Sequence, residues 1–122
     1  MIGNLKIKLN RNELQEFVKA IRALHKYSFE FLGTDDYLHY YNLKSILFKC
    51  LFKMRDTQFT ERKKSVLISM NEFESMKYVA KEIDTFNSQY HDIFITEILH
   101  ALQKQVETYN HIEYNTNNHA TR

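Results

Sequence analysis

The chain has almost none of the residues that make tight turns. Its 122 residues include no proline and two glycines. β-Sandwiches and β-barrels need many tight turns, and these usually contain glycine or proline. Their near absence argues against those architectures and predicts long helices joined by few connections. The apolar content of 43% and the charged content of 26% are ordinary for a globular protein, so disorder over most of the chain is not expected.

Three further absences concern the setting of the protein. Cys50 is the single cysteine, so no internal disulfide forms and nothing indicates an oxidising compartment. Residues 1–10 lack the continuous apolar segment of a secretory signal, and no apolar run approaches the ~20 residues of a membrane span. The formal net charge of +2 gives no global argument for binding nucleic acid or membrane. We therefore expect a cytoplasmic protein that does not associate with membranes.

Familiar catalytic and cofactor motifs are also missing. The sequence contains no Gly-x-Gly-x-x-Gly or Walker-type loop that would cradle phosphate. Glu97-x-x-His100 is half of a dimetal motif, but no second pair matches it, and a surface histidine is the simpler interpretation. Cys50 falls on an apolar helix stripe, where a free thiol behaves as a small hydrophobic group, and no spacing selects a Ser-His-Asp set. The sequence thus predicts a non-catalytic protein with no metal and no cofactor.

The positive signal is a faint internal repeat. Residues 66–83 align without a gap with residues 7–24. In each copy a short, extended-looking run precedes a segment whose apolar residues recur at the helical spacing. Few aligned positions are identical, so a true structural repeat and a chance match of two strand-to-helix units both stay open.

Each strand-to-helix junction carries a helix-capping signal. Ser69 and Glu72 have the spacing of a capping box, in which two side chains and two backbone N–H groups exchange hydrogen bonds. Asn10 and Glu13 hold the aligned positions, and Asn is as good an N-cap as Ser. The sequence therefore predicts that a helix begins directly after each strand.

These patterns predict a mainly helical α+β fold. Two pseudo-symmetric strand-helix-helix units, residues 5–54 and 65–109, would pack four helices on a small antiparallel sheet. The sheet has two strands, or three if Gln58 and Phe59 begin a hairpin. No Gly or Pro lies between the third and fourth helices, so one long kinked helix is the alternative.

The two units belong to one expected domain, residues 1–110. Residues 111–122 are polar and aperiodic, so we expect a flexible C-terminal tail. The expected helices span residues 11–31, 36–54, 70–89 and 92–109.

The helix expected at residues 36–54 is apolar over more than one face. Its main stripe includes Ile46 and Cys50, and Phe48 and Phe52 extend this stripe well round the helix. Burial in the middle of the core is the default expectation for such a helix. A partner interface is the alternative, with Phe48 and Phe52 as the candidate interaction residues.

Acidic and aromatic residues form a second candidate surface at the start of this helix. With one histidine among them, they are Asp35, Asp36, Tyr37, His39, Tyr40 and Tyr41. Tyr offers rigid contact area with a polar tip, which suits a binding surface. In the simpler interpretation Tyr37 and Tyr41 pack inward, and the aspartates cap the helix.

A third candidate is the basic connector between the two units. It contains Arg62, Lys63 and Lys64, with Lys53, Arg55 and Phe59 nearby. Basic residues interleaved with an aromatic ring suit contact with phosphates and bases. A solvated loop is the simpler interpretation of three consecutive basic residues.

The expected function follows from the lack of recognisable chemistry and from the excess of apolar helix surface. The sequence favours a small non-catalytic module that binds a protein partner, or a second copy of itself as a homodimer. The alternative is a nucleic-acid-associated regulator or accessory factor that uses the basic connector and the basic face of the first helix, formed by Lys19, Arg22 and Lys26.

Overall fold

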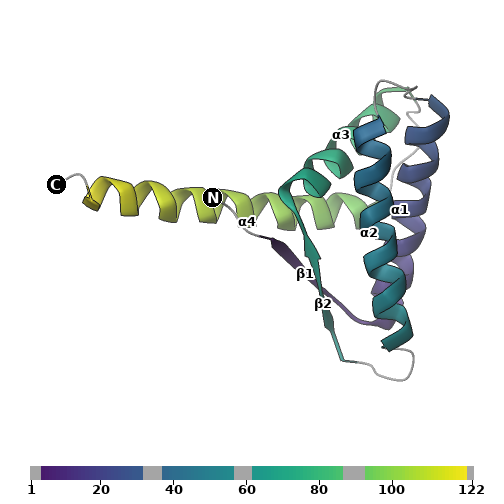
Figure 1. Cartoon of the computed structure of the whole chain (residues 1–122), viewed down its shortest axis with the longest axis horizontal. Helices are drawn as coiled ribbons and strands as arrows, with labels where there is room; N and C mark the ends of the chain where they lie inside the picture. The colour runs from purple at the N-terminus through teal and green to yellow at the C-terminus, as the bar shows by residue number, and fades with distance from the viewer. Residues whose placement is uncertain (1–3, 32–36, 57–61, 87–92, 121–122) are drawn as a thin grey trace.

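The structure is a computed structural model that describes residues 4–31, 37–56, 62–86 and 93–120. Its elements span Leu5–Leu9 (β1), Arg11–Phe31 (α1), Tyr37–Asp56 (α2), Lys64–Ile68 (β2), Met70–Phe86 (α3) and Ile93–Ala120 (α4). Figure 1 shows α1, α2 and α3 gathered on one side of the two strands, while α4 extends away from them. The predicted mainly helical α+β fold, with four helices on a two-stranded antiparallel sheet, is confirmed for these residues.

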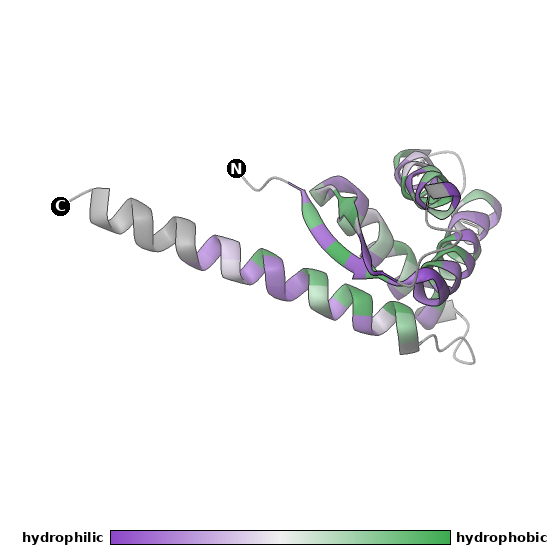
Figure 2. Cartoon of the chain, turned by 90° about the horizontal axis from the view of Figure 1, so that it is seen from below, coloured by the Kyte–Doolittle hydropathy of each residue, from purple (hydrophilic) through white to green (hydrophobic). Residues whose placement is uncertain are grey.

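The two strands form an antiparallel ribbon in which Ile7 lies opposite Val66. Leu5, Ile7 and Leu9 are buried, and the two lysines between them are exposed. Figure 2 shows hydrophobic and hydrophilic residues following each other along the strand. The ribbon therefore has one face toward the core and one toward solvent. Because a two-stranded ribbon is marginal alone, it depends on the helices that cover it.

Both predicted capping boxes are confirmed. The Asn10 N–H donates to Glu13 Oε1 over 3.0 Å, and the Glu13 N–H donates to Asn10 Oδ1 over 2.8 Å. At the second junction the Ser69 N–H donates to Glu72 Oε1 over 2.8 Å, and the Glu72 N–H donates to Ser69 Oγ over 3.1 Å. These bonds satisfy N–H groups that a helix leaves without a partner, so α1 and α3 each begin directly after a strand.

A helix side chain covers each outer edge of the ribbon. Gln105 of α4 donates through Nε2 to the Lys6 carbonyl over 2.6 Å, and its Oε1 accepts from the Lys6 N–H over 2.9 Å. On the other edge Lys49 of α2 donates through Nζ to the Leu67 carbonyl over 2.8 Å. Unpaired strand edges invite pairing with other chains. These contacts cover one residue on each edge and hold α2 and α4 against the sheet.

The core lies between the apolar face of the ribbon and the helices. Phe17 of α1 and Phe73 of α3 are its largest fully buried side chains. Burial of a side chain of this size contributes roughly 2 kcal/mol to stability. The first half of α4 adds Ile95, Ile98 and Leu102 to the same cluster.

The predicted pseudo-symmetry of the two halves is not confirmed. The strands and the caps that follow them correspond, but the second helix of each half does not. In Figure 1 α1 and α2 lie side by side, whereas α4 crosses the two strands and extends on beyond them. The likeness between the halves is therefore local to the strand-to-helix junctions.

Helices three and four are separate, and α4 is longer than expected. The sequence placed its end at Tyr109 and a flexible tail beyond, whereas the helix continues to Ala120. No glycine or proline interrupts this stretch, and its Asn, Thr and His residues disfavour a helix only weakly. The hairpin proposed for Gln58 and Phe59 lies outside the described residues. No described helix combines the length and apolarity needed to cross a membrane.

Candidate protein-interaction surface

Helix α2 has two apolar sides, and one of them faces solvent. Leu43, Ile46 and Cys50 are fully buried, and we call them the inner stripe. Four aromatic residues lie on the opposite side, and we call them the outer seam. Their exposed fractions are 51% for Tyr37, 60% for Tyr41, 51% for Phe48 and 66% for Phe52.

The helical spacing explains why the same helix has both sides. Each residue turns the helix by ~100°, so the four seam residues lie within about one sixth of the circumference. The inner stripe lies on the opposite side of the helix. Leu38 and Arg55, both exposed, flank the seam. The default expectation of central burial therefore holds for the inner stripe and is wrong for Phe48 and Phe52.

Cations lie over the rings of the outer seam. Lys44 Nζ is 5.7 Å from the ring centroid of Phe48 and 6.0 Å from that of Tyr40. Arg55 Cζ is 5.9 Å from the ring centroid of Phe52. Such contacts are weak at exposed sites. They make the surface both aromatic and basic.

The tyrosines at the start of α2 do not pack as the simpler interpretation expected. Tyr37 and Tyr41 are exposed and contact each other, with ring centroids 6.3 Å apart. That interpretation is wrong because both residues lie on the side of α2 opposite the inner stripe. Tyr40 instead packs against α1, where its ring stacks on His25 at 4.4 Å and contacts Phe29 at 5.6 Å. Asp35 and Asp36 lie outside the described residues.

An ion pair fixes the orientation of α2. Lys49 Nζ donates to Glu72 Oε1 as well as to the Leu67 carbonyl. Burial favours a higher pKa for the Glu72 carboxyl. Hydrogen bonds from Lys49, the Ser69 N–H and Ser45, together with the Lys49 charge, outweigh burial and hold that pKa below its ordinary value. Because Glu72 also caps α3, this one carboxylate joins α2, β2 and α3.

A polar cluster makes a second link between α2 and α3. The buried Ser75 Oγ lies 2.9 Å from His39 Nδ1 and accepts from Asn42 Nδ2 over 2.8 Å. The His39 ring stacks on Tyr78 at 4.5 Å. Because Ser75 is only 1% exposed, we assign this histidine-serine pair to helix packing and not to nucleophilic catalysis. Sequence reasoning missed the cluster, since its partners are 36 and 33 residues apart.

The basic connector is only partly available as a surface. Lys63 Nζ forms an ion pair with Glu13 Oε1 at 3.9 Å, and Lys64 lies within β2 opposite Leu9. Arg62 is exposed. Phe59 lies outside the described residues.

The remaining groups of chemical interest are structural or exposed. Burial raises the pKa of the Cys50 thiol to about 12. Burial and the nearby Lys44 charge lower the pKa of His25. Among the described residues no three His, Cys, Asp or Glu side chains gather where they could hold a metal ion. Glu97 and His100 are exposed on α4.

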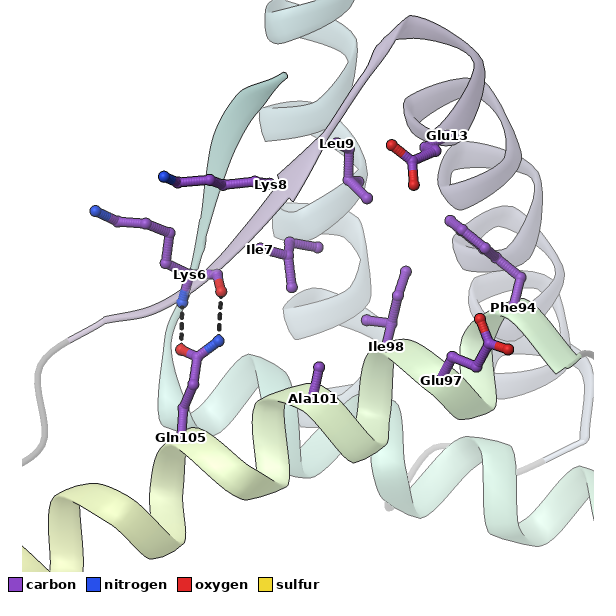
Figure 3. A pocket seen from close by; sticks show the side chains of 10 residues that line it. All are labelled: Lys6, Ile7, Lys8, Leu9, Glu13, Phe94, Glu97, Ile98, Ala101 and Gln105. Carbon is purple, nitrogen blue, oxygen red and sulfur yellow. Dashed lines mark hydrogen bonds between the residues drawn. The ribbon is translucent and has the colours of Figure 1, made fainter. Parts of the chain in front are cut away.

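Figure 3 shows an open pocket of about 290 Å³ between β1 and α4. Gln105 holds the Lys6 backbone at one end, and the Glu13 carboxylate holds the Asn10 N–H at the other. Because alternate residues face one strand edge, only Lys8 remains between them. One residue is too short an edge for an added strand, so we assign no ligand to this pocket.

Comparison with known protein families, with curated proteins and with solved structures finds no match to this chain.

Proposed function

We propose that this protein is a non-catalytic interaction module whose binding surface is the outer seam of α2. The observation that carries the proposal is the exposure of four aromatic side chains in one line on a helix whose opposite side is already buried. Contiguous exposed apolar surface of this kind is uncommon on monomers and marks interaction sites. Tyr and Phe are also enriched at protein interfaces.

The two sides of α2 make different contributions to the free energy of folding. Complete burial of a large apolar side chain stabilises a protein by roughly 2 kcal/mol. In the free chain the four exposed rings do not gain this free energy in full. The core already anchors α2 through the inner stripe, the Lys49–Glu72 pair and the Ser75 cluster. Folding therefore does not require the seam, and a partner that covers it gains this apolar contact on a rigid surface.

The groups with shifted pKa values support a non-catalytic role. His25 packs against Tyr40, Glu72 caps α3, and Cys50 belongs to the core. Each has a structural explanation that needs no substrate. We place the module in the cytoplasm, where a single reduced thiol is ordinary.

Position-specific photocrosslinking tests the proposed surface. A photoreactive phenylalanine analogue replaces Phe48 or Phe52, and in a matched control it replaces Tyr109, which is 39% exposed on α4. Irradiation in cells that naturally produce the protein should give a discrete protein adduct from positions 48 and 52 and not from 109. Equal adduct formation at all three positions, or none at 48 and 52, would sink the proposal.

The alternative, a nucleic-acid accessory factor, has one supporting arrangement. The C-terminal end of α2 and the start of β2 lie at the same end of the molecule in Figure 1. Arg55 is in the last turn of α2, and Arg62 precedes β2 by two residues. This end could contact phosphates. Fluorescence anisotropy with a labelled single-stranded oligonucleotide distinguishes the two functions. Binding that weakens steeply with salt and is lost in Arg55→Gln/Arg62→Gln would favour the alternative.

A further inference from the structure

The outer seam has a symmetric spacing along α2. Tyr41 and Phe48 lie equally far from a point between Lys44 and Ser45, and Tyr37 and Phe52 lie equally far beyond them. A helix turned end for end about this point would place a ring opposite every ring. A surface with this property can bind a copy of itself around a two-fold axis.

The middle of the seam leaves room for close approach. Lys44 leans to one side over the Tyr40 and Phe48 rings. Ser45, on the other side, is small and donates a hydrogen bond to the Glu72 carboxylate. No large side chain therefore stands on the line of the seam at its centre, where two crossing helices come closest.

The two ends of the seam also differ in a complementary way. The N-terminal end carries the hydroxyl-bearing rings of Tyr37 and Tyr41, and the C-terminal end carries Phe52 and the Arg55 guanidinium. Antiparallel pairing places Arg55 of one copy near Tyr37 of the other, where a cation and an aromatic face attract. Parallel pairing would instead place the two Arg55 side chains together.

We propose that the outer seam binds a second copy of this chain, with the two α2 helices antiparallel about the point between Lys44 and Ser45. This inference rests on the proposed function and names its partner. Tyr41 then packs against Phe48 of the second copy, and Tyr37 against Phe52. At ~1.5 Å per residue the seam is about 22 Å long. One short helix pair buries less than the ~800 Å² per partner of a standard interface, so the dimer is weak and dissociates in the micromolar range.

The arrangement also brings one like-charged pair together. The two Lys44 side chains lie on the same side of the seam next to the two-fold axis. Salt screens such repulsion, so dimerisation strengthens as ionic strength rises. Phosphate binding has the opposite salt dependence.

Cysteine crosslinking tests the pairing and its direction. Ser45→Cys places a thiol next to the two-fold axis. Arg55→Cys keeps all four rings and places its two thiols about 30 Å apart, at ~1.5 Å per residue. Because it also loses the contact between Arg55 and Tyr37, light scattering first establishes the concentration at which Arg55→Cys is a dimer, and both variants are crosslinked at that concentration. The native Cys50 is fully buried and does not compete. With a short bis-maleimide, Ser45→Cys should give at least roughly tenfold more covalent dimer than Arg55→Cys. Adding Phe52→Asp to Ser45→Cys should abolish the dimer.

Each other outcome contradicts the inference in a specific way. Comparable dimer from both cysteines would indicate parallel or merely collisional pairing. Lys44→Cys offers a second position beside the axis. If circular dichroism shows that both variants are folded and neither Ser45→Cys nor Lys44→Cys gives a covalent dimer, binding of a second copy is excluded. A heterologous photocrosslink at Phe48 and Phe52 would then still support the interaction module, whereas its absence would remove both proposals.

Discussion

Both sides of α2 carry large apolar or aromatic residues, but only one side is buried. The inner stripe of Leu43, Ile46 and Cys50 is fully buried, whereas the outer seam rings are half exposed or more. The inner stripe faces the packed core, and the described part of this chain places no element over the outer seam. Apolarity alone therefore does not identify the core of this protein. What stands opposite a helix side decides whether its residues hold the fold together or remain available for binding.

The largest expected difference between the two sides is in stability. Ile46→Asp should destabilise the fold by about 4 kcal/mol or more, because it buries an unpaired carboxylate in a fully buried position. Phe52→Asp should change the stability of the monomer by less than about 1 kcal/mol, because its side chain faces solvent. Urea unfolding followed by circular dichroism measures both. Comparable losses would show that the outer seam also belongs to the fold.

The next largest effect concerns the ion pair that anchors the inner side. Glu72→Gln removes the charge partner of Lys49 and weakens the cap of α3. Lys49 is partly exposed, so the expected loss is about 1–3 kcal/mol at pH 7, below that of a fully buried pair. Glu13→Gln at the corresponding, more exposed cap should lose less than about 1 kcal/mol. Thermal or urea unfolding of the matched pair tests this order, and equal losses would contradict it.

The lowered pKa of Glu72 also predicts how the stability of the fold depends on pH. The folded state lowers the pKa of Glu72, so this group contributes stability at pH values above its unfolded-state pKa of ~4.3. That contribution disappears as the pH falls through the lower folded-state pKa. Urea midpoints between pH 7 and pH 3 should therefore fall less steeply below pH 5 for Glu72→Gln than for the wild type. Parallel curves would show that Glu72 does not carry this dependence.

A smaller effect lies at the boundary between the two sides, where His25 stacks on Tyr40. His25 Nε2 is buried without a hydrogen-bond partner among the described residues. His25→Phe keeps a ring on Tyr40 and should stabilise the fold by about 1 kcal/mol. Because the folded state lowers the pKa of His25, its contribution is lost as the pH falls below ~6.5. Unfolding at pH 7.5 and 5.5 should show less acid loss in His25→Phe, and a destabilised variant would refute this account.

The smallest expected effect is the difference in thiol reactivity between the two sides of α2. Burial raises the pKa of Cys50 to about 12, so the native thiol should react with a maleimide dye only when the protein unfolds. In Ser45→Cys the added thiol should be labelled first, while Cys50 stays protected. Mass spectrometry of the labelled protein over time distinguishes the sites. Rapid labelling of Cys50 in the native protein would place it outside the core.

The sequence predicted those parts of the fold that depend on residues close together in the chain. Alternation in β1 and the capping pairs Asn10–Glu13 and Ser69–Glu72 each depend on residues at most a few positions apart. The orientation of α2 depends on distant contacts, such as Lys49 with Glu72 and Asn42 with Ser75, which periodicity does not reveal. The full length of α4 was missed because its polar C-terminal composition resembles that of a tail.

The candidate surface was predicted in part for the same reason. Phe48 and Phe52 were identified from the excess of apolar residues in one helix, and Tyr37 from the acidic and aromatic residues at its start. All three lie on the outer seam. Tyr40 turns toward α1, which only the packing of His25 and Phe29 could show. The four aromatic residues are spaced equally about the middle of α2, and this pattern in the sequence could have identified the complete seam.

The most direct test of the outer seam as a binding surface is size-exclusion chromatography with light scattering, recorded at 260 and 280 nm over a wide range of protein concentration. We predict that the wild type changes from monomer to dimer mass with a protein-like absorbance ratio, while folded Phe52→Asp stays monomeric. The protein has no tryptophan, so co-purified nucleic acid would be conspicuous at 260 nm. A wild type that stays monomeric throughout, or a Phe52→Asp variant that dimerises equally well, would contradict the proposed self-association through the outer seam.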